Sequence, residues 1–405
     1  MPLGHLIKIV INKYVPESDA VRASSSIEPS PRICGSWAEV LPELVGSETK
    51  SALASAIRAF ALTILSRGPE RSVPITAGLE AYQRALITVN DALQAPYSAF
   101  PAKLGAAVMC LLLVELYHLT PVCSWTAHLQ GLAELMQLSQ PEFYASGIPH
   151  RLFVGARPAL VGSPGSRVCR SREFRANLSS SQVVLAFFSR RSSFLAKEEW
   201  RTVPFRESSP SPVQALMSEA AAIPAILEKL DSEGVDAVAE EALHEFDAVL
   251  DRLNAWGDGF QSSASPSPLF WFQPSSGTER PHIWFQNITM ANVLTHLWAF
   301  KIMCLRNIHQ LRLVISKLDS KSSHATTNSD EAKRLSTMIC QSTEYLMQEK
   351  MKLFGPTSVT LPLRTAYAAF EAGGVETKEE LEWCRDIVDD LRNRGYGFMS
   401  VLIGA

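Results

Sequence analysis

The sequence predicts an all-α protein built as a single large multi-helix domain. Apolar residues recur at helical spacing in almost every readable segment, which is typical of amphipathic helices. No segment shows alternating apolar residues around an Asn-Gly or Asp-Gly pair, the pattern that marks a β-hairpin. The chain has 405 residues, of which 46% are hydrophobic, and this is enough to bury a large core.

In the first part of the chain the periodicity predicts four helices, over 48–66, 76–93, 103–119 and 125–138. The first of them places Leu53, Ile57 and Phe60 on one stripe, and Gly68 and Pro69 then stop it. The segment 103–119 is apolar nearly all round, so we expect a helix that is buried on several sides.

The second part of the chain predicts further helices over 213–230, 235–256, 287–318, 330–352, 361–372 and 377–394. Three segments are rich in Ser, Pro and Gly, at 24–31, 257–277 and 316–329. We expect the middle one to be packed because it carries aromatic residues, and the last to be an exposed loop between long helices. None of them separates regions of different composition, which favours one helical domain over two.

Charge and cysteine usage exclude several classes of protein. The 38 basic and 41 acidic side chains give a net charge of −3, so there is no global field to attract a polyanion. The seven cysteines form no C-x-x-C pair, and we expect no metal site and no cofactor. The most apolar segment, 104–114, is shorter than the roughly 20 residues that cross a bilayer, so no membrane contact is expected.

Several strings occur in an order that resembles a known family. SPRICGSWAEVLPEL at 30–44 is followed by AIRAFAL, AYQRAL, CLLLVELYHL and SWTAHLQGLAELMQL, and later by LWAFKIMCLRN, LPLRTAYAAF and EWCRDIVDDLRNRGYGF. Together they resemble the fungal-specific transcription factor domain, the helical regulatory region downstream of a binuclear zinc cluster. The resemblance covers 29–405 and leaves 1–28 as an N-terminal segment without a zinc cluster. It implies a nuclear regulator, for example of a metabolic or secondary-metabolite gene cluster.

The chain departs from that family in its cysteines. The family's DNA-binding element needs six closely spaced cysteines around two zinc ions, and the residues before the matching region contain none. We therefore expect no direct DNA contact from this chain. Three explanations remain open: an upstream segment carries the cluster, the protein acts through a protein partner or as a homodimer, or the scaffold serves another task.

A second departure is the run 161–182, which we interpret as an insertion. Removing it joins Leu160 to Val183 and gives RPALVLAFFSRRSSFLAKEEW, a continuous helix-like pattern. The codons of the run are compatible with a retained intron, and the alternative is an ordinary surface loop. Its four arginines would otherwise suggest a nucleic-acid arm.

The first candidate site contains a carboxylate and two imidazoles. Glu115 and His118 share one helical face, and His128 lies beyond the turn at Pro121. A carboxylate beside an imidazole can orient a general base. The alternative, which we favour, is that these groups satisfy one another between packed helices. With Trp125, they are candidate ligand-binding residues.

The second candidate site is aromatic and includes Trp271, Trp284, Trp298 and His296. Aromatic walls with a few polar groups suit a small apolar effector or substrate, although core packing explains them equally well. No Ser-His-Asp order, GxSxG, P-loop or Rossmann glycine motif is present, and no catalytic residue is identified. The alternative to a regulator is a cofactor-independent biosynthetic enzyme of the cytoplasm, such as a cyclase or pericyclase (a Diels-Alderase, for example), or a small-molecule binder.

Overall fold

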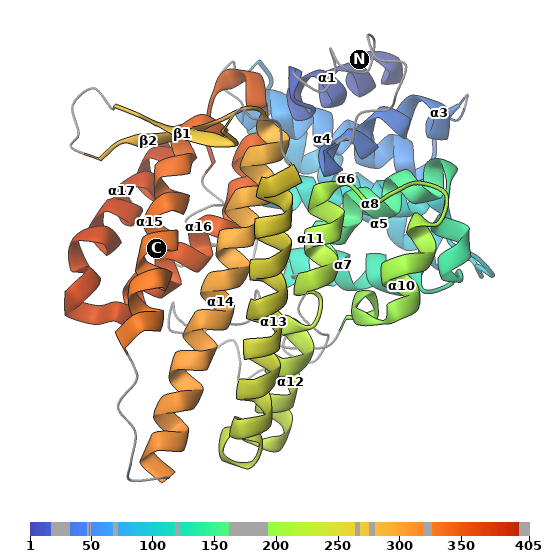
Figure 1. Cartoon of the computed structure of the whole chain (residues 1–405). Coiled ribbons are helices and arrows are strands. Elements are labelled where there is room, and N and C mark those ends of the chain that lie inside the picture. The colour runs from blue at the N-terminus through green and yellow to red at the C-terminus, as the bar shows by residue number, and fades with distance from the viewer. Residues whose placement is uncertain are drawn as a thin grey trace.

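The computed structural model describes residues 1–17, 33–46, 48, 50–67, 72–117, 122–161, 193–263, 268–274, 280–318 and 326–396. These residues form mainly helices together with one small two-stranded sheet (Figure 1). The prediction of an all-α protein is confirmed at this level. Buried apolar residues from the first helix to the last belong to one continuous cluster.

The N-terminal half consists of helices packed around α6 (Ala102–Tyr117). Every residue of α6 from Leu104 to Tyr117 is buried, as its apolar composition predicts. The helices and 3-10 turns around it are α1 (Leu3–Tyr14), η1 (Cys34–Val40), α3 (Leu41–Val45), α4 (Ala52–Arg67), α5 (Ile75–Leu93), α7 (Val122–Met136), η2 (Pro141–Tyr144) and α8 (Gly147–Val161).

The sequence prediction does not include α1 or α8 as helices. Leu6, Val10 and Tyr14 of α1 are buried, and the helix packs on α4 and η1. Residues 1–14 of the predicted segment 1–28 thus contribute to the same core as the residues that follow. Val161 is the last residue of α8, and the rest of the predicted insertion 161–182 lies outside the described residues.

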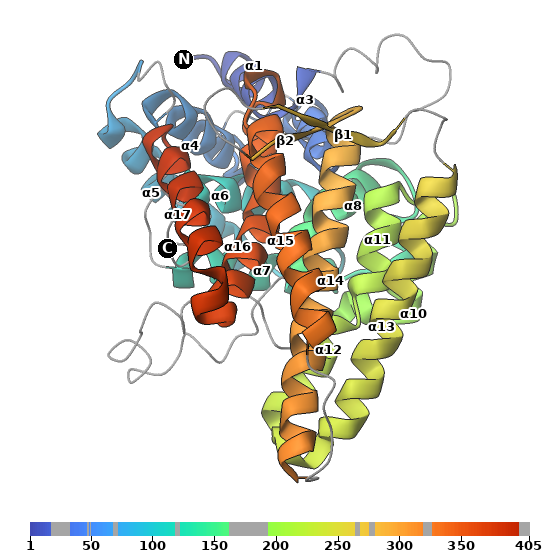
Figure 2. The same ribbon diagram turned by 60° about the vertical axis from the view of Figure 1, so that its left-hand side comes forward.

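The C-terminal half is dominated by long antiparallel helices. In both views α13 (Val235–Ser263) lies beside α14 (Ile288–Leu318), and their lower ends extend beyond the rest of the molecule (Figure 2). The remaining elements are η4 (Phe194–Ala196), α10 (Glu198–Thr202), η5 (Val203–Phe205), α11 (Pro212–Ala220), α12 (Ile223–Glu233), α15 (Thr326–Leu346), η6 (Glu349–Met351), α16 (Phe354–Gly373), η7 (Gly374–Thr377) and α17 (Lys378–Asn393).

Prolines account for two differences from the predicted helices. The segment 213–230 forms two helices, α11 and α12, because Pro224 occupies the first turn of α12 and has no N–H with which to continue α11. Helix α16 begins at Phe354 rather than at 361, because Pro356 is tolerated in a first turn and Pro362 is accommodated inside the helix.

The small sheet corrects the expectation of no hairpin. Strand β1 (Phe270–Gln273) pairs antiparallel with β2 (His282–Phe285), with Trp271 opposite Trp284. The connection 274–281 is longer than the two-residue turns that give the strongest sequence signal. Aromatic residues in both strands favour the extended conformation and supply the packing.

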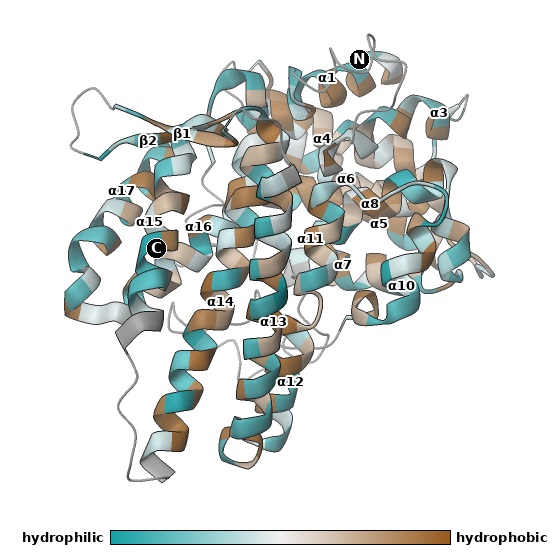
Figure 3. Cartoon of the chain, in the orientation of Figure 1, coloured by the Kyte–Doolittle hydropathy of each residue, from teal (hydrophilic) through white to brown (hydrophobic). Residues whose placement is uncertain are grey.

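Helix α14 begins where the sequence predicts. The side chain of Asn287 accepts a hydrogen bond from the backbone N–H of Met290 at 3.0 Å and caps the helix. Residues 288–316 are long and apolar enough to cross a membrane, but 78% of the most apolar window is buried inside the protein. In Figure 3 hydrophilic and hydrophobic residues alternate around the turns of α13 and α14, as in helices with one solvent-facing side.

The backbones at the end of α15 and the start of α16 lie very close together at Gly355. A Cβ atom at Gly355 would collide with the carbonyl oxygen of Leu346 and would lie 2.7 Å from Cβ of Met351. We expect Gly355→Ala to lower the free energy of unfolding by about 1–3 kcal/mol, because backbone must move to relieve the collision. Urea denaturation measures the change.

Gly4→Ala is the matched control. Gly4 lies on α1 with no atom within 4 Å of the added Cβ, so the substitution should leave stability unchanged or raise it by up to about 1 kcal/mol through helix propensity. Equal unfolding free energies for the two variants would contradict the close approach of α15 and α16.

Candidate ligand-binding cavity

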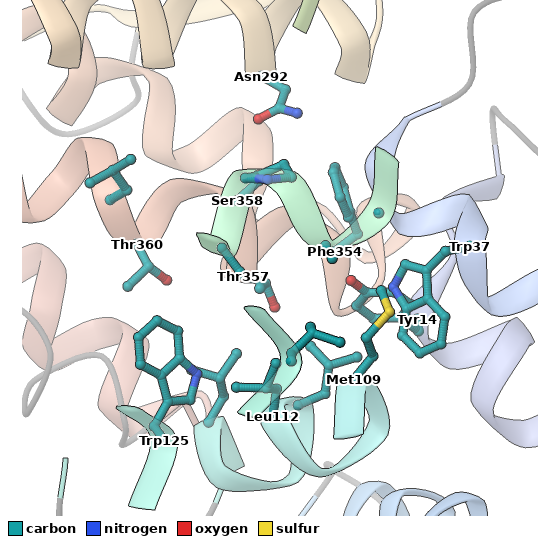
Figure 4. Close-up of a pocket in the computed structure, with 18 of the residues that line it drawn as sticks. Tyr14, Trp37, Met109, Leu112, Trp125, Asn292, Phe354, Thr357, Ser358 and Thr360 are labelled. Carbon is teal, nitrogen blue, oxygen red and sulfur yellow. The ribbon is translucent and has the colours of Figure 1, made fainter. Parts of the chain in front are cut away.

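A cavity of about 180 Å³ lies between the two halves of the molecule. One wall comes from the N-terminal half, and its residues are Tyr14, Trp37, Met109, Leu112, Leu113, Leu116, Trp125, Leu132, Gly155, Ala156, Pro158 and Ala159. The other wall comes from α14 and α16, and its residues are Asn292, His296, Phe354, Thr357, Ser358, Thr360 and Leu361. Figure 4 shows many of these side chains around the open volume.

The wall from the N-terminal half is apolar because α6 supplies four of its residues. Met109, Leu112, Leu113 and Leu116 lie at helical spacing on the face of α6 that points away from α4. Gly155 of α8 is required here, since a Cβ at this position would lie 2.6 Å from the indole ring of Trp37. None of the described residues of either wall is Asp, Glu, Lys or Arg.

Asn292 is the polar group that core packing does not explain. The residue is 3% exposed, and its Oδ1 atom has no hydrogen-bond partner within the described part of the chain. In Figure 4 its amide extends from α14 toward the open volume. A buried amide oxygen without a partner costs about 1–3 kcal/mol, and a hydrogen-bond donor in the cavity would remove that cost.

His296 lies one turn further along the same face of α14. Its Nδ1 is 2.7 Å from the backbone carbonyl oxygen of Asn292, and because a carbonyl can only accept, Nδ1 carries the hydrogen. Burial lowers the pKa of His296 from 6.5 to about 4, so the ring is neutral at pH 7. Nε2 therefore presents a bare lone pair, an acceptor, on the wall of the cavity.

Hydroxyl groups from α16 complete the polar wall. The Thr357 hydroxyl donates to the Leu353 carbonyl at 2.7 Å, and the Ser358 hydroxyl donates to the Gly355 carbonyl at 2.8 Å. Each hydroxyl has a single hydrogen. These two oxygens can therefore only accept a hydrogen bond from a group in the cavity.

Of the residues proposed from the sequence, the cavity brings together Trp125 and His296. Glu115 and His128 form a separate cluster with Tyr82. The Tyr82 hydroxyl donates to Glu115, and the Nε2 atom of His128 lies 3.6 Å from Glu115 Oε1 and 3.3 Å from the Tyr82 oxygen. Glu115 is buried, and the cluster provides its partners between packed helices, the alternative that the sequence favours. His118 lies outside the described residues.

The predicted tryptophans pack against other rings. Trp298 lies 5.8 Å from Phe270, and Trp284 meets Tyr345 edge-on at 5.4 Å between ring centroids. Trp271 is 44% exposed on β1. These three residues do not line the cavity. Trp298 joins the sheet to α14 and Trp284 joins it to α15, whereas no ring contact of this kind involves the exposed Trp271 among the described residues.

Sequence reasoning missed most of the cavity, including Asn292, Thr357 and Ser358. One signal was available. In MANVLTHLWAF the only strongly polar side chains besides Thr295 are Asn292 and His296, four positions apart and therefore on one face of an otherwise apolar helix. Tyr14 and Trp37 gave no such signal, because they come from elements whose packing on α8 and α16 is not encoded in local periodicity.

Within the described ranges no group of three or more His, Cys, Asp or Glu residues is placed to hold a metal ion. Comparison with family models, with curated proteins and with solved structures finds no match to this chain. The description of the site therefore depends on its own geometry.

The depressed pKa of His296 predicts a pH dependence of stability. The unfolded chain takes up a proton below pH 6.5 that the native state accepts only near pH 4, so stability falls as pH falls through this window. Between pH 7 and pH 5 we expect the wild type to lose about 2 kcal/mol more than His296→Gln, which has no titrating ring.

Urea denaturation at both pH values measures this difference, because subtracting the variant from the wild type removes the contribution of other groups. His309→Gln, on the same helix but outside the cavity, is the control and should keep the wild-type pH dependence. A parallel loss of stability in the wild type and His296→Gln would contradict the neutral, buried imidazole.

Proposed function

We propose that this chain is a ligand-responsive helical regulatory protein whose cavity binds a small, neutral, mainly apolar molecule. The observation that carries the proposal is the buried Oδ1 atom of Asn292, which has no partner among the described residues and faces the cavity. A bound molecule that supplies a hydrogen bond would remove the cost of that group.

The size and charge of the cavity support a small neutral ligand. An apolar cavity of about 150 Å³ is large enough to bind benzene, and the volume here is about 180 Å³. A charged ligand would lose its hydration without gaining an opposite charge, because no ionised side chain is found among the described residues that line the cavity.

The regulatory part of the proposal comes from the resemblance of the sequence to the fungal-specific transcription factor domain. The sequence contains no six-cysteine cluster, so regulation would pass through a protein partner, a second copy of the chain or a cluster carried by an upstream segment. The ligand would then be an effector, and the protein would work in the nucleus.

The second candidate is a cofactor-independent enzyme such as a cyclase or pericyclase. It is favoured by the shape of the cavity, since apolar walls with one amide can hold a reactive conformer and lower a barrier by orientation. General-base chemistry is disfavoured, because a pKa near 4 makes Nε2 of His296 a weak base at neutral pH.

Toluene tests whether the cavity binds a small apolar molecule. We expect calorimetric titration with toluene to show saturable binding, and thermal unfolding to shift upward with toluene concentration because the native state alone binds. Leu112→Trp should abolish both effects, since the added ring fills the volume beside Leu112 in Figure 4.

The control is Leu79→Trp, at a 38% exposed position of α5 away from the cavity, which should bind toluene like the wild type. Absence of toluene binding in the folded wild-type protein, or equal binding by Leu112→Trp and the wild type, would overturn the proposed binding function.

Localisation separates the two candidates. A fluorescent fusion of the full chain, expressed in a fungal host, is expected to accumulate in the nucleus if the chain is a regulator. An even cytoplasmic distribution that persists when the cavity is filled by Leu112→Trp would count against the regulator and support the enzyme. Fluorescence microscopy with a nuclear stain makes the measurement.

A further inference from the structure

The polar wall of the cavity is built from hydrogen-bond acceptors. Asn292 contributes Oδ1, which has no partner in the described part of the chain, and His296 contributes the lone pair of Nε2. Both come from adjacent turns of α14. Each of these two acceptors would be stabilised by a hydrogen-bond donor in the cavity.

Helix α16 adds further acceptors through its side chains. The hydroxyl hydrogens of Thr357 and Ser358 are both donated to carbonyls of α16 itself, so their oxygens offer lone pairs. In Figure 4 Thr357 and Ser358 lie below Asn292, on the same side of the open volume.

A proline leaves one more acceptor at this position. Pro362 has no N–H, so it cannot donate to the carbonyl of Ser358, which would be its helical partner. The same situation occurs on α8, where Pro158 leaves the Val154 carbonyl without its helical donor.

The carbonyl that each proline leaves without a helical donor has different surroundings on α8 and on α16. On α8 the side-chain amide of Gln214 donates to Val154 at 3.0 Å and replaces the missing N–H. On α16 no side chain among the described residues donates to the carbonyl of Ser358, a residue that lines the cavity. The contrast leaves the carbonyl of Ser358 available to a donor in the cavity.

The donors of the cavity lie elsewhere on its surface. The indole of Trp37 and the hydroxyl of Tyr14 lie together at one end in Figure 4, and the indole of Trp125 lies at the other. The NH₂ group of Asn292 is a further donor, and the hydroxyl of Thr360 donates its hydrogen to the Pro356 carbonyl at 3.3 Å. Leu112 and Leu116 of α6 face the acceptors from across the volume and offer only hydrocarbon.

Resting on the proposed function, we infer that the cavity selects neutral aromatic ligands that carry a hydroxyl donor, phenols in the simplest case, and that Asn292 and His296 determine this selectivity. The ring lies against the leucines of α6, and the hydroxyl points to α14 and α16. A ligand of equal size without a donor leaves the acceptors buried and unpaired, which is what makes a site discriminate.

Phenol and toluene test the inference because they have the same shape and differ by a hydroxyl in place of a methyl group. The measurement is the dissociation constant of each, by calorimetric titration at pH 7, where phenol is neutral. A purely apolar cavity would prefer toluene, because phenol must give up its hydration. We expect the wild type to bind phenol at least as tightly as toluene.

Variants of the two residues sharpen the test. Asn292→Leu and His296→Phe should each weaken phenol binding about tenfold, the effect of one hydrogen bond, and leave toluene binding unchanged or tighter. Asn307→Leu and His309→Phe make the same changes on α14 outside the cavity and should bind both probes like the wild type.

A third variant covers the case in which a change on α14 prevents folding. Thr357→Val keeps the shape of the side chain, removes one acceptor oxygen, and should also weaken phenol binding selectively.

The outcomes separate the inference from the proposed function. Selective loss of phenol binding in the variants supports the inference. Toluene binding without phenol binding, or an equal loss of both probes in the variants, overturns the inference and leaves the binding function standing. Binding of neither probe by the folded wild type overturns both.

Discussion

The burial of α6 is the constraint on which the rest of the N-terminal half depends. A helix whose residues from Leu104 to Tyr117 are all buried must be covered on every side, and α4, α5, α7 and α8 supply most of that cover. Residues of α14 and α16 lie across the cavity from α6. The open volume thus lies where the packing between the two halves of the molecule is incomplete.

Buried polar groups elsewhere in the described part of the chain show which feature sets Asn292 apart. Glu115 is matched by Tyr82 and His128. Arg157, which is fully buried, donates to the Gln214 carbonyl at 2.8 Å and to Ser218 at 2.7 Å. Other buried atoms, such as Trp284 Nε1 and Arg306 Nε, also have no partner among the described residues, but of these atoms Asn292 Oδ1 alone belongs to a residue that lines the cavity.

The sequence predicts the helices well and the site poorly, for reasons that particular residues make clear. The apolar composition of 103–119 is sufficient to predict a buried helix, and Asn287 marks the start of α14 through its capping side chain. Periodicity identifies the face of a helix that is buried, but not which helix will cover it. It therefore cannot place Trp37 near Ser358, two residues far apart in the chain that line one cavity.

The aromatic residues of the hairpin illustrate the same limit. A cluster of Trp and Phe satisfies the composition of a ligand pocket and of a packed core equally, and the difference depends on volume that only three-dimensional packing decides. Here Trp298 meets Phe270 at 5.8 Å and leaves no room, whereas His296, two residues earlier on α14, faces the open side.

The internal hydrogen bonds of α14 and α16 have a consequence for the entropy of binding. The carbonyl of Asn292 fixes the imidazole of His296, and carbonyls of α16 fix the hydroxyl rotors of Thr357 and Ser358 before any ligand arrives. Immobilising a flexible side chain on binding costs about 0.5–1.5 kcal/mol. Because the helices already hold these three groups, the polar wall is preorganised, and a ligand that enters loses mainly its own freedom of motion.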